Sequence, residues 1–263
     1  MGDNGKRILE YNIGLQTWGE FPMYMFSLFA VAVLENQLLL VGGFNDMKDE
    51  YSNRVSVWTK QGSYWRNWTA MPTPRCEVAA VGYKRWLVVA GGFERNGPLD
   101  VVEVFDRSTS QWSVADSLPE PCVGLRSTMV IEPSGRGNDV WYLLGEGGIK
   151  NHRPAFAASL PLLTSQTGSG IIAWKILPQP PLKSSGAVAV RGFLLAVGGK
   201  DGHSQRQDVH IYLPGTCEWL HVADLPSARH SCACASLLDS KFVVYGGREK
   251  KDFSADFIQA SAT

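Results

Sequence analysis

A pair of glycines that follows a run of apolar residues recurs five times in this chain. The segments are LLLVGGF at 38–44, LVVAGGF at 87–93, LLGEGGI at 143–149, LLAVGGK at 194–200 and FVVYGGR at 242–248. The first glycines of these pairs are 48 to 56 residues apart along the chain. A period near fifty residues is typical of propellers and arrays, in which each repeat is one structural unit that packs on its neighbours.

Other residues recur in phase with the glycine pairs. In four repeats an aromatic residue precedes a Trp by seven positions: Tyr11 and Trp18, Trp58 and Trp65, Phe105 and Trp112, Tyr212 and Trp219. A Leu-Pro or Met-Pro turn follows three of these Trp residues, and an Arg closes the turn in MPTPR at 71–75 and LPSAR at 225–229. This combined pattern resembles the kelch repeat, and the resemblance covers about residues 8–260.

The resemblance implies an all-β fold, a β-propeller of kelch type that forms a single domain over residues 8–260. Each repeat then supplies four strands, a to d, to one antiparallel blade. Small residues such as CEVAAVGY at 76–83 suit strand a at the crowded centre of the ring. The apolar run before the glycines suits strand b, which is buried on both faces, and the glycines permit a bend and close backbone approach at its end.

The five glycine pairs predict five four-stranded blades. We expect the ring to close by pairing of the terminal strands, with residues 7–18 as strands c and d beside strands a and b at 230–247. An alternative remains, because SADFIQA at 254–260 is a second candidate for strand c. If both segments are used, the chain is an incomplete six-bladed ring. The third repeat departs most from the pattern, with long loops expected at 132–139 and 159–174.

Composition and motifs favour a binding protein over an enzyme. The 25 basic and 25 acidic residues give no net charge, which argues against nucleic-acid or membrane partners. The five cysteines and five histidines lack metal-ligand or catalytic spacing, so we expect no catalytic residue, no metal and no cofactor. The thiols are interpreted as small buried residues in a reducing compartment. No apolar leader is apparent at the N-terminus, and we expect a cytoplasmic protein.

The topology of a blade predicts where a partner binds. Strands b and d run in the same direction, so the b–c and d–a loops lie together on one face. These loops are rich in Arg, Lys, His and Tyr, which suits an acidic or Ser/Thr-rich peptide. The candidate partner-binding residues are Tyr24, Arg75, Arg95, His203, Arg229 and Arg248. A structural alternative applies to Arg75 and Arg229, whose guanidinium groups could bind loop carbonyls within a blade.

Three hypotheses for function follow. The first is a protein-interaction module, an adaptor or scaffold; the resemblance implies a possible role in substrate recognition within a ubiquitin-ligase or signalling complex. The second is a propeller enzyme or metal-binding protein with a small-molecule site in the central channel. The third is a scaffold domain belonging to a larger multidomain protein.

Overall fold

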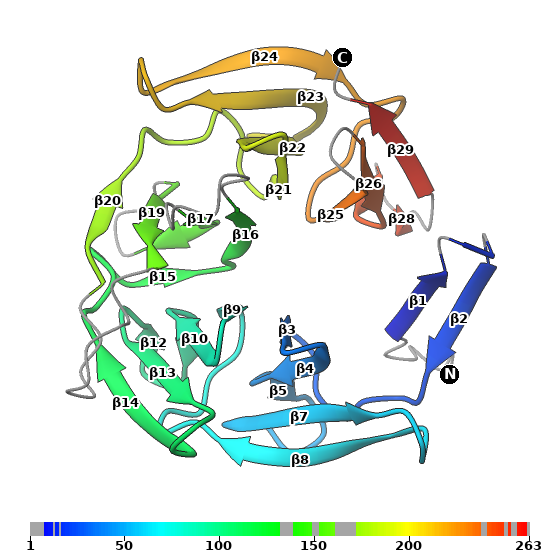
Figure 1. The fold of residues 1–263 in the computed structure, drawn as a ribbon. Helices are drawn as coiled ribbons and strands as arrows, with labels where there is room; N and C mark the ends of the chain where they lie inside the picture. Colours follow the sequence, from blue (N-terminus) through cyan, green and yellow to red (C-terminus); the bar gives the residue numbers. More distant parts are fainter. Residues whose placement is uncertain are drawn as a thin grey trace.

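The computed structural model describes residues 8–261 except 13, 16, 132–138, 149–152, 161–171, 238–240, 250–251 and 254–256. Most of the two long loops expected in the third repeat lies outside the described residues. The described chain contains strands and no α-helix, and its antiparallel sheets are arranged around a central axis (Figure 1). The expected all-β propeller architecture is confirmed.

Four blades have four strands each, in the order a to d from the centre outward. Blade 1 contains β3 (Ala30–Leu34), β4 (Gln37–Val41), β7 (Arg54–Thr59) and β8 (Tyr64–Ala70). Blade 2 contains β9 (Ala79–Tyr83), β10 (Trp86–Ala90), β13 (Val102–Asp106) and β14 (Gln111–Ala115). Blade 3 contains β16 (Arg126–Val130), β17 (Val140–Leu144), β19 (Ala155–Ser159) and β20 (Trp174–Ile176). Blade 4 contains β21 (Gly186–Val190), β22 (Phe193–Asp201), β23 (Ser204–Leu213) and β24 (Glu218–Asp224).

The remaining strands form smaller sheets. A three-stranded sheet contains β25 (Ala233–Leu237), β26 (Lys241–Tyr245) and β29 (Phe257–Ser261), and an N-terminal hairpin contains β1 (Ile8–Asn12) and β2 (Thr17–Phe21). Four two-stranded ribbons pair β5 (Phe44–Asn45) with β6 (Glu50–Tyr51), β11 (Phe93–Glu94) with β12 (Gly97–Pro98), β15 (Cys122–Val123) with β18 (Gly147–Gly148), and β27 (Arg248–Glu249) with β28 (Asp252–Phe253).

The predicted pairing of the two chain ends in one blade is wrong. Strand β26 pairs along its length with β29, and in the described residues β1 pairs only with β2. The hairpin lies between the three-stranded sheet and blade 1 (Figure 1), where Trp18 packs 5.0 Å from Tyr245 and Phe21 packs 4.7 Å from Trp58. Both candidate c strands are therefore used, as in the alternative expectation, and a count of five closed blades is not confirmed. Strand β29 is much nearer to β26 in the sequence than the N-terminal segment is. Pairing β26 with β29 therefore closes a shorter loop, and closing a shorter loop costs less conformational entropy.

The hydrophobic core lies between blades. In β10, Leu87 and Val89 pack against blade 1, whereas Val88 and Ala90 pack against blade 3. All four side chains are fully buried. Successive residues of a strand point to opposite faces, so a strand between two neighbours must be apolar on both.

The glycine pairs allow one blade to contact the loop that enters the next. Gly42 and Gly43 have φ values of +67° and +114°. A Cβ on Gly42 would lie 2.4 Å from the carbonyl oxygen of Arg75, and the N–H of Gly43 donates to the same oxygen at 3.0 Å. Gly198 and Gly199 contact Arg229 in the same way. The close backbone approach predicted at the end of strand b is confirmed.

The third repeat has a different register from the one that its Gly-Gly pair predicts. The N–H of Gly42 donates to residue 54 and that of Gly91 to residue 101, and the equivalent donor in blade 3 is Gly145, which bonds Pro154. The structural counterpart of the glycine pair is therefore Gly145 with Glu146. The pair Gly147–Gly148 lies two residues further along, in β18.

Candidate functional site

The b–c and d–a loops lie together on one face of the ring. In blades 1, 2 and 4, the residue three positions before the inner strand forms an isolated bridge with a residue just after the Gly-Gly pair of the same blade: Ser27 with Phe44, Cys76 with Phe93, and Lys183 with Lys200. In blade 3 the longer ribbon β15–β18 takes this place. The structure thus has the loop arrangement expected from blade topology, and we call this surface the loop face.

A ring of left-handed residues follows these bridges. The residues are Leu28, Glu77, Gly124, Ser184 and Ser231, with φ between 52° and 61°. Backbone bonds link neighbouring blades through them, since the N–H of Glu77 donates to Leu28 at 2.9 Å and that of Ser231 to Ser184 at 2.8 Å. Non-glycine residues adopt this conformation at a cost of about 1–2 kcal/mol. Its recurrence in each repeat indicates that the propeller architecture requires it.

All five of these residues line one central cavity of about 860 Å³. Lys200, His230 and Gly247 on the loop face also line it, so the cavity opens at that face. Its polar groups include Glu77, Arg126 and Glu146, and the guanidinium of Arg126 donates to Glu146 Oε1 at 3.1 Å. The mouth of the cavity therefore combines cations with carboxylates.

Glu146 occupies a position that is glycine in the other four repeats. Its counterparts are Gly43, Gly92, Gly199 and Gly247. In blade 3 the left-handed position before the inner strand is instead Gly124, and a Cβ there would lie 2.8 Å from the Cβ of Glu146. A side chain and a glycine have thus exchanged places in this blade. The exchange puts a carboxylate at the cavity, which the fold itself does not require.

The charge of Glu146 also affects a neighbouring carboxyl group. Burial raises the pKa of Glu77, and the nearby Glu146 carboxylate raises it further, against the opposing charge of Arg126. Two acids near one cation compete for its stabilisation. Arg126 therefore interacts with two carboxyl groups, those of Glu77 and Glu146.

Three of the predicted binding residues lie in the interior. The side chains of Arg75 and Arg229 are fully buried, and Tyr24 is only 6% exposed. Arg75 donates to the carbonyl oxygens of Gly91 and Val101, and the hydroxyl of Tyr24 lies 2.9 Å from Ser56 Oγ. Burial raises the pKa of Tyr24. These positions favour the structural alternative for the two arginines and give Tyr24 a packing role.

The other predicted residues lie on loops. Arg95 is exposed in the turn between β11 and β12, and His203 is exposed in the turn between β22 and β23. Arg248 begins β27, and its side chain is outside the part that the structure describes. Sequence reasoning missed Glu77 and Glu146. The signal for Glu146 was the irregular GEGG of the third repeat, where an acid interrupts an otherwise regular glycine pattern.

The comparisons with known proteins agree with the repeat pattern. One Kelch motif profile matches residues 26–72, and a second matches residues 74–119. The chain therefore contains Kelch motifs, which supports the kelch resemblance of its repeats. The chain is 25% identical over 255 residues to "Kelch-like protein 35" of Mus musculus, covering 94% of this chain and 40% of that protein. It is 29% identical to "Kelch repeat and BTB domain-containing protein 13" of Homo sapiens, covering 42% of this chain and 24% of the relative.

A solved structure supports the fold. "Structure of YjhT" aligns with a TM-score of 0.76 at 15% identity, covering 99% of this chain and 90% of that one. At this identity the likeness concerns the fold alone. The chain spans 40% or less of the length of the two curated kelch relatives above. In the described residues, no helix has both the length and the apolar character needed to cross a membrane.

Proposed function

We propose that this chain is a protein-interaction module that binds a peptide segment of a partner on the loop face, over the mouth of the central cavity. The observation that carries this proposal is the exchange of Gly124 and Glu146, which places the Arg126–Glu146 pair at the cavity mouth. Kelch-repeat proteins are generally protein-interaction modules, and we propose a non-enzymatic role here too.

The chemistry of the mouth suits an acidic or Ser/Thr-rich peptide. Arg126 and Glu146 are each about one-third exposed, so an incoming ligand can reach both. A carboxylate or phosphate of the peptide replaces Glu146 as the partner of Arg126, because a guanidinium forms paired, charge-assisted hydrogen bonds with such groups. Because Glu146 is already paired with Arg126, it competes with the ligand for this guanidinium, and weakly binding anions do not displace it. Lys200 at the mouth, and Arg95 and His203 in the surrounding turns, extend the contact surface.

We further propose an adaptor or scaffold role in the cytoplasm, within a ubiquitin-ligase or signalling complex. Names of the chain's relatives support this placement: one is a BTB domain-containing protein, and another is "F-box/kelch-repeat protein At5g03020" of Arabidopsis thaliana, 31% identical over 35% of this chain. In this role the propeller, residues 8–260, recognises the partner, and other domains or subunits supply the remaining functions of the complex.

The size of the cavity favours a second candidate, a small-molecule site in the central channel. At about 860 Å³ the cavity is within the range of about 300–1,000 Å³ common for small-ligand sites. The polar groups at its mouth would then orient the molecule. In this case a small anion, and no peptide, occupies the space beside Arg126.

The experiment that separates these candidates is fluorescence anisotropy with peptide pools. Acidic, phosphorylated and basic pools of equal length are titrated with the wild-type chain and with Arg126→Gln. We expect the acidic or phosphorylated pool to bind the wild type and to lose at least tenfold in affinity with Arg126→Gln. The variant Lys60→Glu/Lys84→Glu is the control, because these exposed residues lie in c–d and a–b turns, opposite the loop face. Equal binding of all pools, or unchanged binding by Arg126→Gln, would contradict the proposal.

A further inference from the structure

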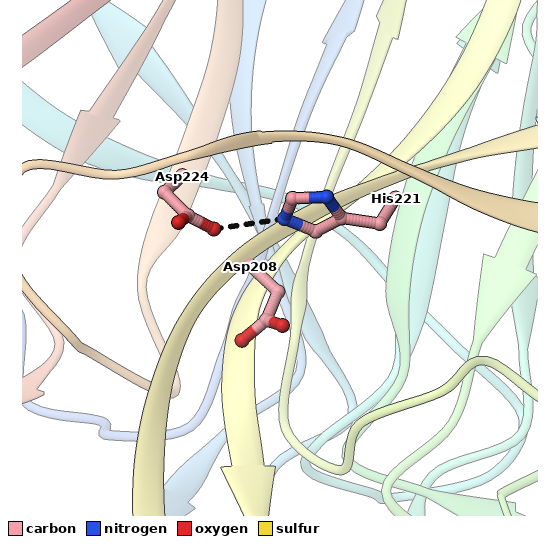
Figure 2. A group of neighbouring side chains, drawn as sticks. All are labelled: Asp208, His221 and Asp224. Carbon is pink, nitrogen blue, oxygen red and sulfur yellow. Dashed lines mark hydrogen bonds and ion pairs between the residues drawn. The ribbon is translucent and has the colours of Figure 1, made fainter.

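A second group of side chains lies on the outer strands of blade 4 and shares no residue with the lining of the central cavity. Asp208 is on β23, and His221 and Asp224 are on β24 (Figure 2). One potential ligand atom from each residue lies within 4.8 Å of the other two. His221 Nε2 is 2.8 Å from Asp224 Oδ1. The group faces a hollow of about 450 Å³.

A β-bulge brings His221 and Asp224 together. Residues three apart on a regular strand point to opposite faces. Here Val209 is opposite Ala223 and His210 is opposite His221, so Val222 is an extra residue in β24. The extra residue reverses the alternation, as bulges do where they re-aim a side chain. It turns His221 to the side of Asp224, whose direct cross-strand partner is Asp208.

Blade 1 has the same bulge with different side chains. The register of β7 and β8 shifts between Val55 and Ser56, and Arg54 is opposite Ala70. The residues of blade 1 that correspond to Asp208, His221 and Asp224 are therefore Arg54, Asn67 and Ala70. The shared backbone geometry does not require an imidazole and two carboxylates. Their presence in blade 4 needs another explanation.

Neighbouring groups hold the three side chains in place. Gln207 Nε2 donates to Asp224 Oδ2 at 3.2 Å, and the ring of His210 packs 5.6 Å from the ring of His221. Arg206 donates to both oxygens of Asp208, at 3.0 and 3.3 Å. Contacts of this kind orient the ligands of metal sites. Arg206 also opposes a cation, because its own charge lies beside one of the carboxylates.

We propose that Asp208, His221 and Asp224 form a binding site for a divalent transition-metal ion of the zinc type. One imidazole nitrogen with two carboxylate oxygens is a donor set for such ions, and a water completes a tetrahedral shell. When the ion binds, His221 Nε2 and Asp224 Oδ1 exchange their mutual hydrogen bond for bonds to the metal. Arg206 releases Asp208 and turns toward solvent, where almost half of its side chain is already exposed.

The test is isothermal titration of the full chain with Zn²⁺ alone, in a buffer that does not bind metals. We expect one ion per chain. His221→Gln and Asp224→Asn should each weaken binding at least tenfold. His203→Ala, which removes an exposed imidazole from the turn between β22 and β23 of the same blade, should leave it unchanged. Arg206→Gln should tighten binding at least threefold, because it removes the competing charge.

The unfolding midpoint with and without Zn²⁺ is a second measurement, which distinguishes loss of the site from misfolding of a variant. Zn²⁺ should raise the unfolding midpoint of the wild type and of Arg206→Gln but not that of His221→Gln, provided that all three unfold cooperatively without metal. Absence of saturable binding by the wild type overturns the proposal. So does binding that persists in His221→Gln and Asp224→Asn, since the ion then lies elsewhere.

Discussion

The guanidinium group of Arg75 lies against the carboxylate of Glu103 inside blade 2, where neither side chain is more than 1% exposed. Arg75 also donates to the carbonyl oxygen of Val101 at 2.8 Å, and Thr73 donates to the second oxygen of Glu103 at 2.6 Å. The ion pair thus joins the d–a loop that enters the blade to its third strand. Arg75, which the sequence suggested as a partner-binding residue, instead holds the d–a loop in place from inside the blade.

Arg75→Met should destabilise the protein strongly. It leaves the buried carboxylate of Glu103 without its cation, and breaking such a pair typically costs about 3–5 kcal/mol. Chemical denaturation measures this cost. The comparison is Arg126→Met, which removes an ion pair about one-third exposed and should cost less than about 1 kcal/mol. Equal losses for the two variants would show that Arg75 has no special structural role.

Gly145→Ala and Gly147→Ala test the register of the third repeat. A Cβ on Gly145 would lie 2.2 Å from Cys122 Sγ and 2.9 Å from Pro154 Cγ, so we expect a loss of about 1–3 kcal/mol. Nothing lies within 4 Å of a Cβ on Gly147, and the change there should be within about 0.5 kcal/mol. Thermal unfolding of the two variants is the measurement. The reverse order would mean that Gly147 is the true counterpart of the other repeat glycines.

The stability of the protein should depend on pH through Glu77. Its pKa is raised in the folded state, first by burial and then by the charge of Glu146, above an ordinary value of 4.5. The folded protein therefore holds this proton more tightly than the unfolded chain does. Stability from this group is present below pH 4.5 and is lost as the pH rises through the raised pKa.

Glu77→Gln should remove this dependence and stabilise the protein at neutral pH relative to the wild type. Glu146→Gln should lower the pKa of Glu77, because one of the two causes of its elevation is gone. Carbon-detected NMR titration of the glutamate carboxyl groups reports both effects. A Glu77 carboxyl that titrates at or below 4.5 in the wild type is incompatible with this explanation.

The cysteines should differ widely in reactivity. Cys217 is exposed, whereas Cys76, Cys122 and Cys232 are buried, so the prediction of small buried thiols is wrong for Cys217. Burial raises the pKa of both Cys76 and Cys122 to about 12. Since the thiolate is the reactive form, iodoacetamide at pH 7.5 should alkylate Cys217 first and leave these two unmodified in the folded protein.

Peptide mapping by mass spectrometry measures this order. The variant Cys217→Ser is the control, and in it Cys76 and Cys122 should stay unmodified until denaturant is added. Alkylation of Cys122 as fast as Cys217 in the folded wild type would contradict the burial described here.

The sequence predicted features that depend on local physics repeated in each blade. Apolar residues on both faces of β10 and the close approach at Gly42 follow from strand alternation and the absence of a Cβ, and both can be read from spacing. Ring closure could not be predicted in this way. Tyr11 and the segment 254–260 both fit the pattern of a third strand, and only the three-dimensional pairing of β26 with β29 distinguishes them.

In the candidate site too, residues that recur in each repeat could be interpreted from the sequence, whereas contacts between distant segments could not. Arg75 and Arg229 occupy equivalent positions in two repeats, and a residue that recurs with the architecture is better read as part of it. Glu146 breaks the repeat, which is the stronger indication of function. Its proximity to Arg126 and Glu77 depends on residues from three different segments meeting at the cavity, and no spacing in the sequence reports that.

Affinity capture from source cells followed by quantitative mass spectrometry tests the central claim, that partners bind the loop face. The wild type is compared with Arg95→Glu/Arg126→Glu on that face and with Lys60→Glu/Lys84→Glu on the opposite turns, all with matching unfolding midpoints. The account predicts that partners retained by the wild type and by the Lys60/Lys84 variant are lost from the Arg95/Arg126 variant. Identical partners for all three, or loss only from the Lys60/Lys84 variant, would contradict it.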